Sequence, residues 1–352
     1  MAISQILLET RLFERRAVAL SGEKPATLFH DSPLIDRGPR LGTHHAVCLR
    51  ETPAGLDGGF CETPEGETVF VRFGKSSSPA LGTRISVEIV AEAHGGKAAR
   101  GQRMPTETPL GRQDVFEAWC GQFYEGVSVL AAESQEQYAL LDEAFDEALA
   151  PSVTLQGGGR LGLARTPALT AVDIDTSGRK ARGGRRRLAE DMNLQAAREL
   201  ARQVALRGLG GLIVMDCVAP ITKTIGGEIK AAFLGSFRDL SARRAQALAP
   251  SPFGLMEISL AWAECPIEEV LGGAGEVLSP IGQLLEGLRL CEREILGRPA
   301  PSLTLAVPVA ASEKLQTLPG GADRLAKRFA EALGPSLNIE VSPTGRVEVV
   351  RP

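Results

Sequence analysis

Short strand-like segments dominate the first hundred residues. Residues 1–38 contain ILLETRL followed by RRAVAL, which predicts one or two strands, and they run into the Pro/Gly-rich stretch DSPLIDRGPRLG. Four more such segments follow between residue 42 and about residue 104, separated by glycine-containing turns: THHAVCLRE, GGFCET, ETVFVRF and RISVEIVAEA. Short strands at this spacing predict a small β-barrel inserted into the chain, for which an OB-fold is the natural candidate.

A helical pattern replaces the strand pattern after residue 114. Between residues 114 and 149, the segment EQYALLDEAFDEAL places its apolar side chains on one face of a helix: Leu140, Leu141, Ala144, Phe145 and Leu149. The next segment, SVTLQGGGRLGLAR, predicts a hairpin that turns at its three consecutive glycines.

A strand, a helix and a second strand follow the hairpin. The strand 168–175 contains Asp173 and Asp175, the helix 193–207 carries an apolar stripe, and the strand LIVMD ends at Asp216. In a βαβ unit of this kind the two strands are parallel and the crossover is right-handed, so both acidic ends lie at the same edge of the sheet. Open α/β sheets bind their ligands at this edge.

The last part of the chain is set off by the segment 271–282, LGGAGEVLSPIG, which is typical of a linker. Beyond it, helical and strand-like segments alternate in the order QLLEGLRLCEREIL, LTLAVPV, ADRLAKRFAEAL, NIEV and RVEVV. This order predicts a small α/β domain.

The composition is that of a soluble globular protein, with 43% hydrophobic and 23% charged residues. No apolar run approaches the roughly 18 residues that a membrane span requires, so we expect no membrane partner. The amino terminus mixes charged residues into its apolar ones, unlike a secretory signal, and we expect a cytoplasmic protein. The six cysteines form no CxxC pair, which argues against a disulfide framework and a zinc site. The net charge of -4 excludes little, because an acidic total can hide a basic local surface.

Three carboxylates are expected to converge at the edge of the βαβ unit. Asp173 and Asp175 face the same way because they lie two residues apart in a strand, and Asp216 joins them from the neighbouring strand. Raised pKa values, a basic partner or a hard divalent cation would relieve their repulsion. Mg²⁺ fits, since it prefers oxygen ligands and commonly sits on one or two carboxylates plus a substrate phosphate. Taken alone, the DxD pattern is more often a solvated turn.

A basic loop over residues 177–187 adjoins these acids. Its glycines leave the backbone adaptable, and its positively charged side chains can neutralise phosphates: Arg179, Lys180, Arg182, Arg185, Arg186 and Arg187. A basic run by itself is usually a solvated loop. Beside paired acids, it indicates hydrolysis of a phosphodiester by metal-activated water.

Three segments resemble the bacterial ribonuclease E/G family in their order, their spacing and the identity of their residues: ALTAVDIDTSGR, NLQAARELARQVALRGLGGLIVMD and SPFGLMEIS. The resemblance implies an endoribonuclease that cleaves single-stranded RNA in RNA processing or decay and leaves a 5′-phosphate and a 3′-hydroxyl. It implies that Asp173 and Asp216 bind the catalytic Mg²⁺, with Mn²⁺ as an alternative, and that Asp175 supports them. In the barrel it implies that bases stack on Phe60 and Phe70 beside Lys97. Ordinary barrel core is the competing interpretation of both phenylalanines.

The family's architecture implies how this α/β (α+β multidomain) chain is divided. Its catalytic core would combine ribonuclease-H-like and DNase-like parts, with an inserted OB-fold and a small C-terminal α/β domain. The expected ranges are 1–38 and 105–155 for the ribonuclease-H-like subdomain, 39–104 for the OB-fold RNA-binding domain, 156–270 for the DNase-like catalytic domain, 271–282 for a linker and 283–352 for the C-terminal domain.

Four departures from the family pattern matter. Asp175 stands where the family usually has asparagine, which alters the charge beside the metal. The segment after the barrel is too short for the family's 5′-end sensor, so we expect no preference for 5′-monophosphorylated RNA. Only Cys265-Pro266 corresponds to the zinc-linking Cys-Pro-x-Cys motif, so we expect no zinc and either a monomer or a zinc-independent homodimer. Basic residues that would contact phosphate are replaced by Leu260, Ala261 and Trp262.

Two hypotheses compete with an active nuclease. A catalytically weak or inactive relative that binds RNA as a regulator would explain the lost sensor, zinc link and basic residues. An enzyme acting on a small phosphate ester is the other. The retained carboxylates favour the nuclease, because a pure RNA binder has no reason to keep acids facing a polyanion.

Overall fold

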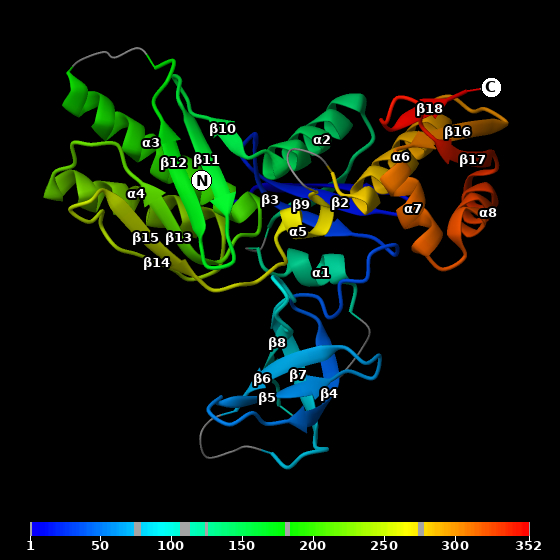
Figure 1. The fold of residues 1–352 in the computed structure, drawn as a ribbon, viewed down its shortest axis with the longest axis horizontal. Coiled ribbons are helices and arrows are strands. Elements are labelled where there is room, and N and C mark those ends of the chain that lie inside the picture. The colour runs from blue at the N-terminus through cyan, green and yellow to red at the C-terminus, as the bar shows by residue number, and fades with distance from the viewer. Residues whose placement is uncertain are drawn as a thin grey trace.

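A computed structural model describes residues 2–73, 79–105, 113–123, 126–179, 184–273 and 278–351 of the chain. In these residues, helices connect a four-stranded sheet, a closed barrel, a six-stranded sheet and a three-stranded sheet. Three of these units lie in a row with the four-stranded sheet in the middle, and the barrel extends below them (Figure 1). The expected mixed α/β class is confirmed.

The central four-stranded sheet is assembled from chain on both sides of the barrel. Its strand order is β3-β2-β1-β9, and β9, which follows the barrel in the chain, lies parallel to β1. The elements are β1 (Gln5–Thr10), β2 (Arg15–Ser21), β3 (Lys24–Asp31), β9 (Ser128–Ala131), α1 (Val115–Cys120) and α2 (Gln135–Leu149). The barrel is therefore an insertion between strands of one sheet.

Two details of this region differ from the sequence expectation. Residues 1–38 hold three strands, because β3 is buried along most of its length and shows no alternation of apolar and polar positions. The stretch 114–149, expected to be helical, contains the strand β9. All four residues of β9 are exposed at the sheet edge, so no buried face marks that strand in the sequence.

The inserted barrel closes in the strand order β4-β5-β6-β8-β7. Its strands are β4 (His44–Glu51), β5 (Gly58–Glu62), β6 (Thr68–Arg72), β7 (Arg84–Ala91) and β8 (Ala99–Arg103). Alternate residues of each strand fill its interior, among them Val47, Val69, Val71, Val87 and Ile89. The expected barrel is confirmed, with β8 as a strand that the sequence pattern did not predict.

The six-stranded sheet contains the expected βαβ unit. Its order is β10-β11-β12-β13-β15-β14, and β12 and β13 are parallel neighbours. The strands are β10 (Ser152–Thr154), β11 (Arg160–Arg165), β12 (Thr170–Asp175), β13 (Gly211–Asp216), β14 (Ala245–Ala247) and β15 (Leu255–Leu260). Side chains of α3 (Arg185–Leu206) and α4 (Lys223–Leu240) form one core with the buried face of this sheet. Helix α3 begins eight residues before the expected residue 193, so Arg185, Arg186 and Arg187 lie in its first turn.

The C-terminal unit is a three-stranded sheet in the order β17-β16-β18. Its elements are α6 (Pro280–Gly297), β16 (Ser302–Val307), α7 (Val309–Thr317), α8 (Gly321–Leu333), β17 (Ser336–Val341) and β18 (Glu348–Val350), and the short helix α5 (Ile267–Leu271) precedes them. The sequence pattern predicted these elements except α7. In the described part of the chain, no helix combines the length and apolarity needed to cross a membrane.

Buried charges join helix α6 to the central sheet. Arg293 on α6 lies 2.7 Å from Glu9 and 2.7 Å from Asp142, and Arg289 lies 2.6 Å from Glu14. Burial alone would raise the pKa of Glu9, but the hydrogen bonds and charges of Arg293 and Arg16 lower it to about 2. Because an unpaired buried charge costs several kcal/mol, these pairs restrict α6 to one position on the sheet.

Glu292 lies in the same junction but has a different protonation behaviour. Its carboxyl group is 3% exposed and accepts the backbone N–H of Leu12 at 2.8 Å. Burial raises the pKa of Glu292 from 4.5 to about 7. The protonated carboxyl therefore stabilises the fold fully below about pH 4.5, and this contribution is lost as the pH rises through about 7.

We expect Glu292→Gln to leave the free energy of unfolding unchanged near pH 4.5 and to raise it by roughly 2–3 kcal/mol at pH 8, because glutamine cannot ionise. Urea unfolding at both pH values measures the difference. Glu340→Gln, at an exposed position of β17, is the control and should show no such dependence on pH. Equal destabilisation by Glu292→Gln at both pH values would contradict the assignment.

Candidate active site and nucleic-acid interface

Asp173 and Asp216 are neighbours on the open face of the six-stranded sheet. The parallel strands pair Val172 with Met215, and each aspartate is the next residue along its strand. Val172 and Met215 are buried in the core formed with α3 and α4, so the alternation of side chains exposes both aspartates on the opposite face. Within the described residues, neither carboxylate has a hydrogen-bond or ion-pair partner. The structure thus brings together the two residues expected to bind the metal.

Asp175 lies on the same face but is engaged in its own turn. Its two carboxylate oxygens accept the hydroxyl of Ser177 at 2.6 Å and the backbone N–H of Ser177 at 2.8 Å. These two hydrogen bonds, the hydroxyl one first, lower the pKa of Asp175. Among the described residues, no three His, Cys, Asp or Glu side chains converge as metal ligands. The expected group of three carboxylates is therefore a pair. The hydrogen bonds of Asp175 instead fix the turn at Ser177, where β12 ends and the basic loop begins.

Asn193, buried in the middle of α3, fixes the loop that follows Asp216. Its side-chain amide donates to the carbonyl of Val218 at 2.9 Å, and its carbonyl oxygen accepts the N–H of Val218 at 2.8 Å. The side chain is fully buried. The sequence pattern did not assign this role to Asn193, although an amide within an apolar helix stripe is a signal of a buried hydrogen-bond partner.

The six basic residues expected to contact RNA do not behave alike. Arg185, Arg186 and Arg187 are exposed at the start of α3, and Arg186 forms an ion pair with Glu190 at 2.9 Å. Arg179 is half-buried and donates to Gln195 at 2.8 Å and to the carbonyl of Gln156 at 3.3 Å, so it ties the basic segment to α3 and to the hairpin turn. Lys180 and Arg182 lie outside the described residues.

Phe60 and Phe70 lie side by side on the outer surface of the barrel. They are directly opposite each other on β5 and β6, with ring centroids 5.2 Å apart in an edge-to-face arrangement. The interior is filled by the alternate residues, such as Val69 and Val71, so neither ring belongs to the barrel core. The ring of Phe70 lies over Gly58, where an added Cβ would approach its Cζ to 2.7 Å. The structure thus excludes the core interpretation.

A groove of about 720 Å³ joins Phe60 to Lys97 at the base of the barrel. Lys97 is exposed, and the groove is also lined by Glu67 and Glu269. Glu269 accepts the backbone N–H of Gly95 at 2.7 Å, which fixes the loop that carries Lys97. One expected aromatic residue and the expected lysine therefore share one groove.

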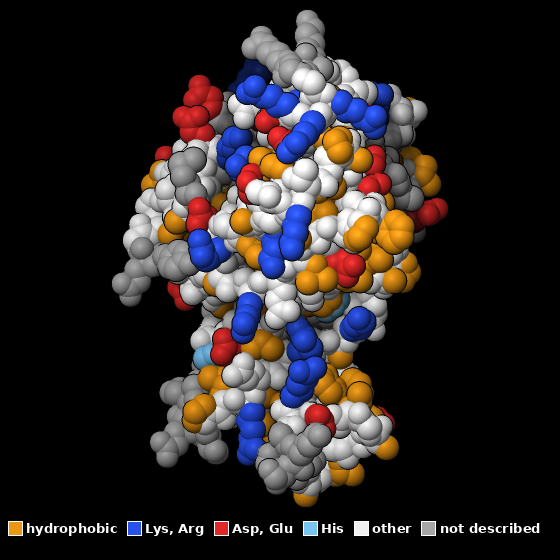
Figure 2. All heavy atoms as spheres, turned by 90° about the vertical axis from the view of Figure 1, so that its left-hand side faces the viewer, with side chains coloured by type: hydrophobic (Ala, Val, Ile, Leu, Met, Phe, Trp, Pro, Cys, Tyr) orange, Lys and Arg blue, Asp and Glu red, His pale blue; other side chains and the backbone are white. Residues whose placement is uncertain are grey.

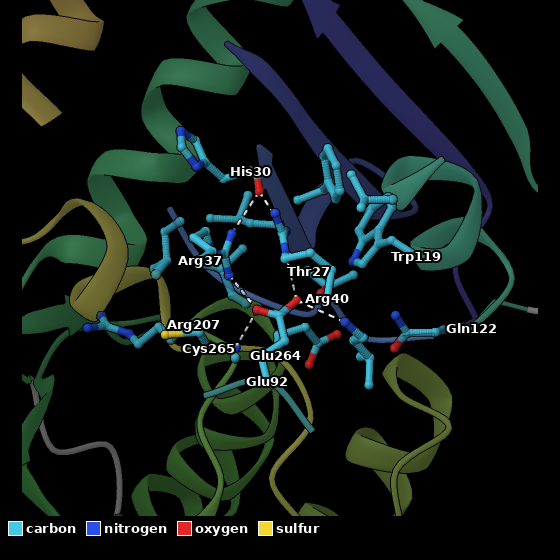
Figure 3. Close-up of a pocket in the computed structure, with 17 residues that line it drawn as sticks. Thr27, His30, Arg37, Arg40, Glu92, Trp119, Gln122, Arg207, Glu264 and Cys265 are labelled. Atoms are coloured by element: carbon cyan, nitrogen blue, oxygen red, sulfur yellow. Dashed lines mark hydrogen bonds and ion pairs between the residues drawn. The ribbon is translucent and has the colours of Figure 1, made fainter. Parts of the chain in front are cut away.

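Buried charges hold the barrel against the rest of the molecule (Figure 3). Glu92, at the end of the β7 segment, forms ion pairs with Arg37 at 2.6 Å and Arg40 at 2.9 Å and accepts the N–H of Cys265 at 3.1 Å. Burial would raise the pKa of Glu92, but the charges of the two arginines lower it to about 2. Burial raises the pKa of the Cys265 thiol to about 12, so this thiol is protonated at neutral pH.

The cavity beside this junction has a volume of about 30 Å³, which is room for two or three water molecules and not for a nucleotide. Nε1 of Trp119 and Nε2 of Gln122 line the cavity region and have no hydrogen-bond partner within the described residues, which suits ordered water. We therefore regard this cavity as part of the joint between barrel and sheet.

Trp262, at a position where basic residues were expected, also belongs to this joint. Its ring stacks on His94 from the barrel with centroids 4.1 Å apart, and it lies close over Gly210, where an added Cβ would approach the ring to 2.8 Å. The backbone carbonyl of Trp262 accepts a hydrogen bond from Arg100 at 3.2 Å. Leu260 is buried in the core under the six-stranded sheet. Packing thus occupies both positions: Trp262 packs against the barrel, and Leu260 packs in the core of the sheet.

The fold and the site together define a mixed α/β protein with a closed barrel, several sheets and paired carboxylates on an open sheet face. Residues 119–261, which include both aspartates, match the model of the Ribonuclease E/G family. The resemblance to this family is therefore confirmed over these residues.

Curated relatives agree with this match. The chain is 34% identical to Ribonuclease E of Haemophilus influenzae over 177 residues, which is 48% of this chain and 19% of that protein. It is 33% identical to Ribonuclease E of Escherichia coli over 48% of this chain and 16% of that protein. It is also 33% identical to the chloroplastic Ribonuclease E/G-like protein of Arabidopsis thaliana over 34% of this chain and 12% of that protein. The chain thus spans less than a fifth of the length of these relatives.

We expect Asn193→Ala to lower the free energy of unfolding by about 1–3 kcal/mol, because the backbone groups of Val218 would lose their buried partner. Chemical denaturation of both proteins measures the loss. Asn338→Ala, at an exposed position of β17, is the matched control and should change stability by less than about 0.5 kcal/mol. Equal stability of the Asn193→Ala variant and the wild type would refute the role of this amide.

Proposed function

We propose that this protein is a Mg²⁺-dependent endoribonuclease that cleaves single-stranded RNA and leaves a 5′-phosphate and a 3′-hydroxyl. One observation carries the proposal: Asp173 and Asp216 stand next to each other, exposed and without a partner among the described residues, inside the segment that matches the Ribonuclease E/G family. RNA processing or decay in the cytoplasm is the setting we infer for this activity.

The donor set of the carboxylate pair suits Mg²⁺. Two exposed carboxylates offer hard oxygen ligands and leave other positions for waters and a substrate phosphate, which is how this ion is usually bound. Mn²⁺ is the alternative, since oxygen ligands suit it as well. When bound, the ion would polarise the phosphate and lower the pKa of a coordinated water.

The protein's own groups have separate roles in this proposal. Asp173 and Asp216 would hold the ion, since both carboxylates are exposed on the open face of the sheet. Asp175 acts as a positioning residue through Ser177, because both of its oxygens are used to fix the turn after β12. Arg185 and Arg187, exposed at the start of α3, would offset the negative charge that develops on the phosphate.

In this proposal, the barrel binds the RNA strand. Its half-buried, outward-facing Phe60–Phe70 pair can stack bases of any sequence, and Lys97 in the adjoining groove can contact a phosphate. Its five strands are the number found in OB-folds, which supports that assignment. Lys and Arg side chains recur down the face that carries the six-stranded sheet above and the barrel below (Figure 2).

We expect Asp173→Asn and Asp216→Asn each to reduce Mg²⁺-dependent cleavage of a labelled single-stranded RNA by on the order of 100-fold or more, because each removes an anionic ligand of the ion. Gel analysis of products with Mg²⁺ and with a chelator measures the loss. Asp323→Asn, exposed on α8, is the control variant and should cleave like the wild type. Equal products from all four proteins would identify a contaminant. RNA binding with no cleavage by any of them would favour the alternative function of an RNA-binding regulator.

We expect Phe60→Ala and Phe70→Ala each to weaken binding of a short single-stranded RNA by roughly 1–3 kcal/mol, since each removes a stacking surface. Fluorescence anisotropy at several salt concentrations measures the affinity, which should fall steeply with salt because phosphate contacts release counterions. Leu81→Ala is the control, because Leu81 is 64% exposed in the barrel domain but lies outside the aromatic pair. Unchanged affinity in both phenylalanine variants would show that this aromatic pair of the barrel does not bind RNA.

A further inference from the structure

Phe253 is the most exposed large hydrophobic residue in the described part of the chain, at 89% exposure. An aromatic ring that stays in water contributes little to the stability of the fold. A group of exposed apolar residues commonly marks a contact site. Its position is what distinguishes it from an ordinary surface residue, because it lies in the turn that leads into β15, next to the strand that ends at Asp216.

The turn that carries Phe253 is fixed by hydrogen bonds. The N–H of Gly254 donates to the carbonyl of Ser251 at 2.9 Å, and the N–H of Ser251 donates to the carbonyl of Leu255 at 3.0 Å. The N–H of Cys217, the residue after Asp216, donates to the carbonyl of Gly254 at 3.0 Å. The turn is thus attached to the backbone that carries the catalytic carboxylate.

Gly254 makes this attachment feasible. Its φ of +89° is a conformation that other residues rarely adopt, and an added Cβ would lie 3.2 Å from the carbonyl oxygen of Cys217 and 3.8 Å from Oδ1 of Asp216. Only a residue without a side chain lets the turn come this close. Phe253 is therefore held at the edge of the carboxylate pair by a backbone with little freedom to move.

The surface next to Phe253 combines apolar and acidic groups. Leu255 is 39% exposed and pairs directly with Asp216, and Leu248, whose backbone N–H donates to the carbonyl of Glu257, is 60% exposed. Glu257 is exposed on the same strand as Leu255. A phosphate would be repelled by these carboxylates unless a cation lay between them, whereas the flat apolar face of a base meets no such penalty against a phenyl ring.

A nucleotide strand fits this combination better than a second protein. A stable protein interface covers about 800 Å² per partner and excludes unpaired charges from its centre. Here the turn of Phe253 lies beside Asp216, and Glu257 is exposed on the strand that follows, so a protein that covered this surface would have to desolvate both carboxylates. A base stacked on the ring leaves them in water.

We propose that Phe253 stacks on the base of a nucleotide adjacent to the phosphate held at Asp173 and Asp216, and so places the RNA strand for cleavage. This inference rests on the proposed function and deepens it by assigning a substrate contact to the same site. Phe253 acts here as a binding residue, and it transfers no proton.

The first experiment measures cleavage of two short RNAs, one intact and one with a single abasic nucleotide next to the cleavage site. We expect Phe253→Ala to lower kcat/KM for the intact RNA about 5- to 100-fold, as loss of one stacked base implies. The abasic position should impair the wild type by a similar factor and the variant hardly at all, because both changes remove the same contact. Independent, multiplying effects of the two changes would overturn the proposal while leaving the proposed nuclease function intact.

The second experiment needs no cleavage and therefore separates the two proposals. In a Phe253→Trp, Asp173→Asn protein, binding of the intact RNA should quench the tryptophan emission, and the abasic RNA should quench it much less. Val309→Trp in the same background places the reporter at an exposed position of α7 and should not respond. Quenching without cleavage by the wild type would retain the base contact and reject the nuclease. Equal responses to both RNAs, or emission that depends on protein concentration without RNA, would overturn the base contact.

Discussion

The parallel pairing of β12 with β13 is the constraint on which the candidate site depends. Val172 and Met215 must be buried beneath α3 and α4, and this burial forces Asp173 and Asp216 onto the open face. A shift of one residue would bury charges and expose apolar side chains, so the register is strongly determined. The helix that makes the crossover between these strands also supplies Asn193, which fixes the loop after Asp216.

Buried charges hold the other units around this sheet. Glu92 with its two arginines positions the barrel, and Arg293 with Glu9 positions the C-terminal helix α6. Buried ion pairs contribute little net stability, but each one demands its partner in place, since separation leaves an uncompensated charge. Their effect is to favour one relative orientation of barrel and sheet. If the proposed function holds, the stacked bases and the cleaved phosphate lie at a set distance along one RNA strand.

The success of sequence-based prediction varied with the pattern available in each element. The barrel strands other than β8 and the βαβ unit were predicted because each has one buried face, which leaves a period of two or of 3.6 in the sequence. Strand β3 was missed because it is buried on both faces, and β9 because it is exposed on both. The start of α3 was placed too late, since its first turn is a run of arginines with no apolar face.

The sequence by itself determined the chemical inventory of the protein: the acids at two strand ends, the basic run, the paired phenylalanines and the resemblance to a known family. The tertiary structure decided which contacts these residues make. It turned Asp175 toward Ser177, tied Arg179 to Gln195, directed the aromatic pair out of the barrel and set the turn of Phe253 against Asp216. The reason is physical: local periodicity records which face of an element is buried, whereas these contacts depend on closure of a barrel, on a turn, or on pairing between strands far apart in the chain.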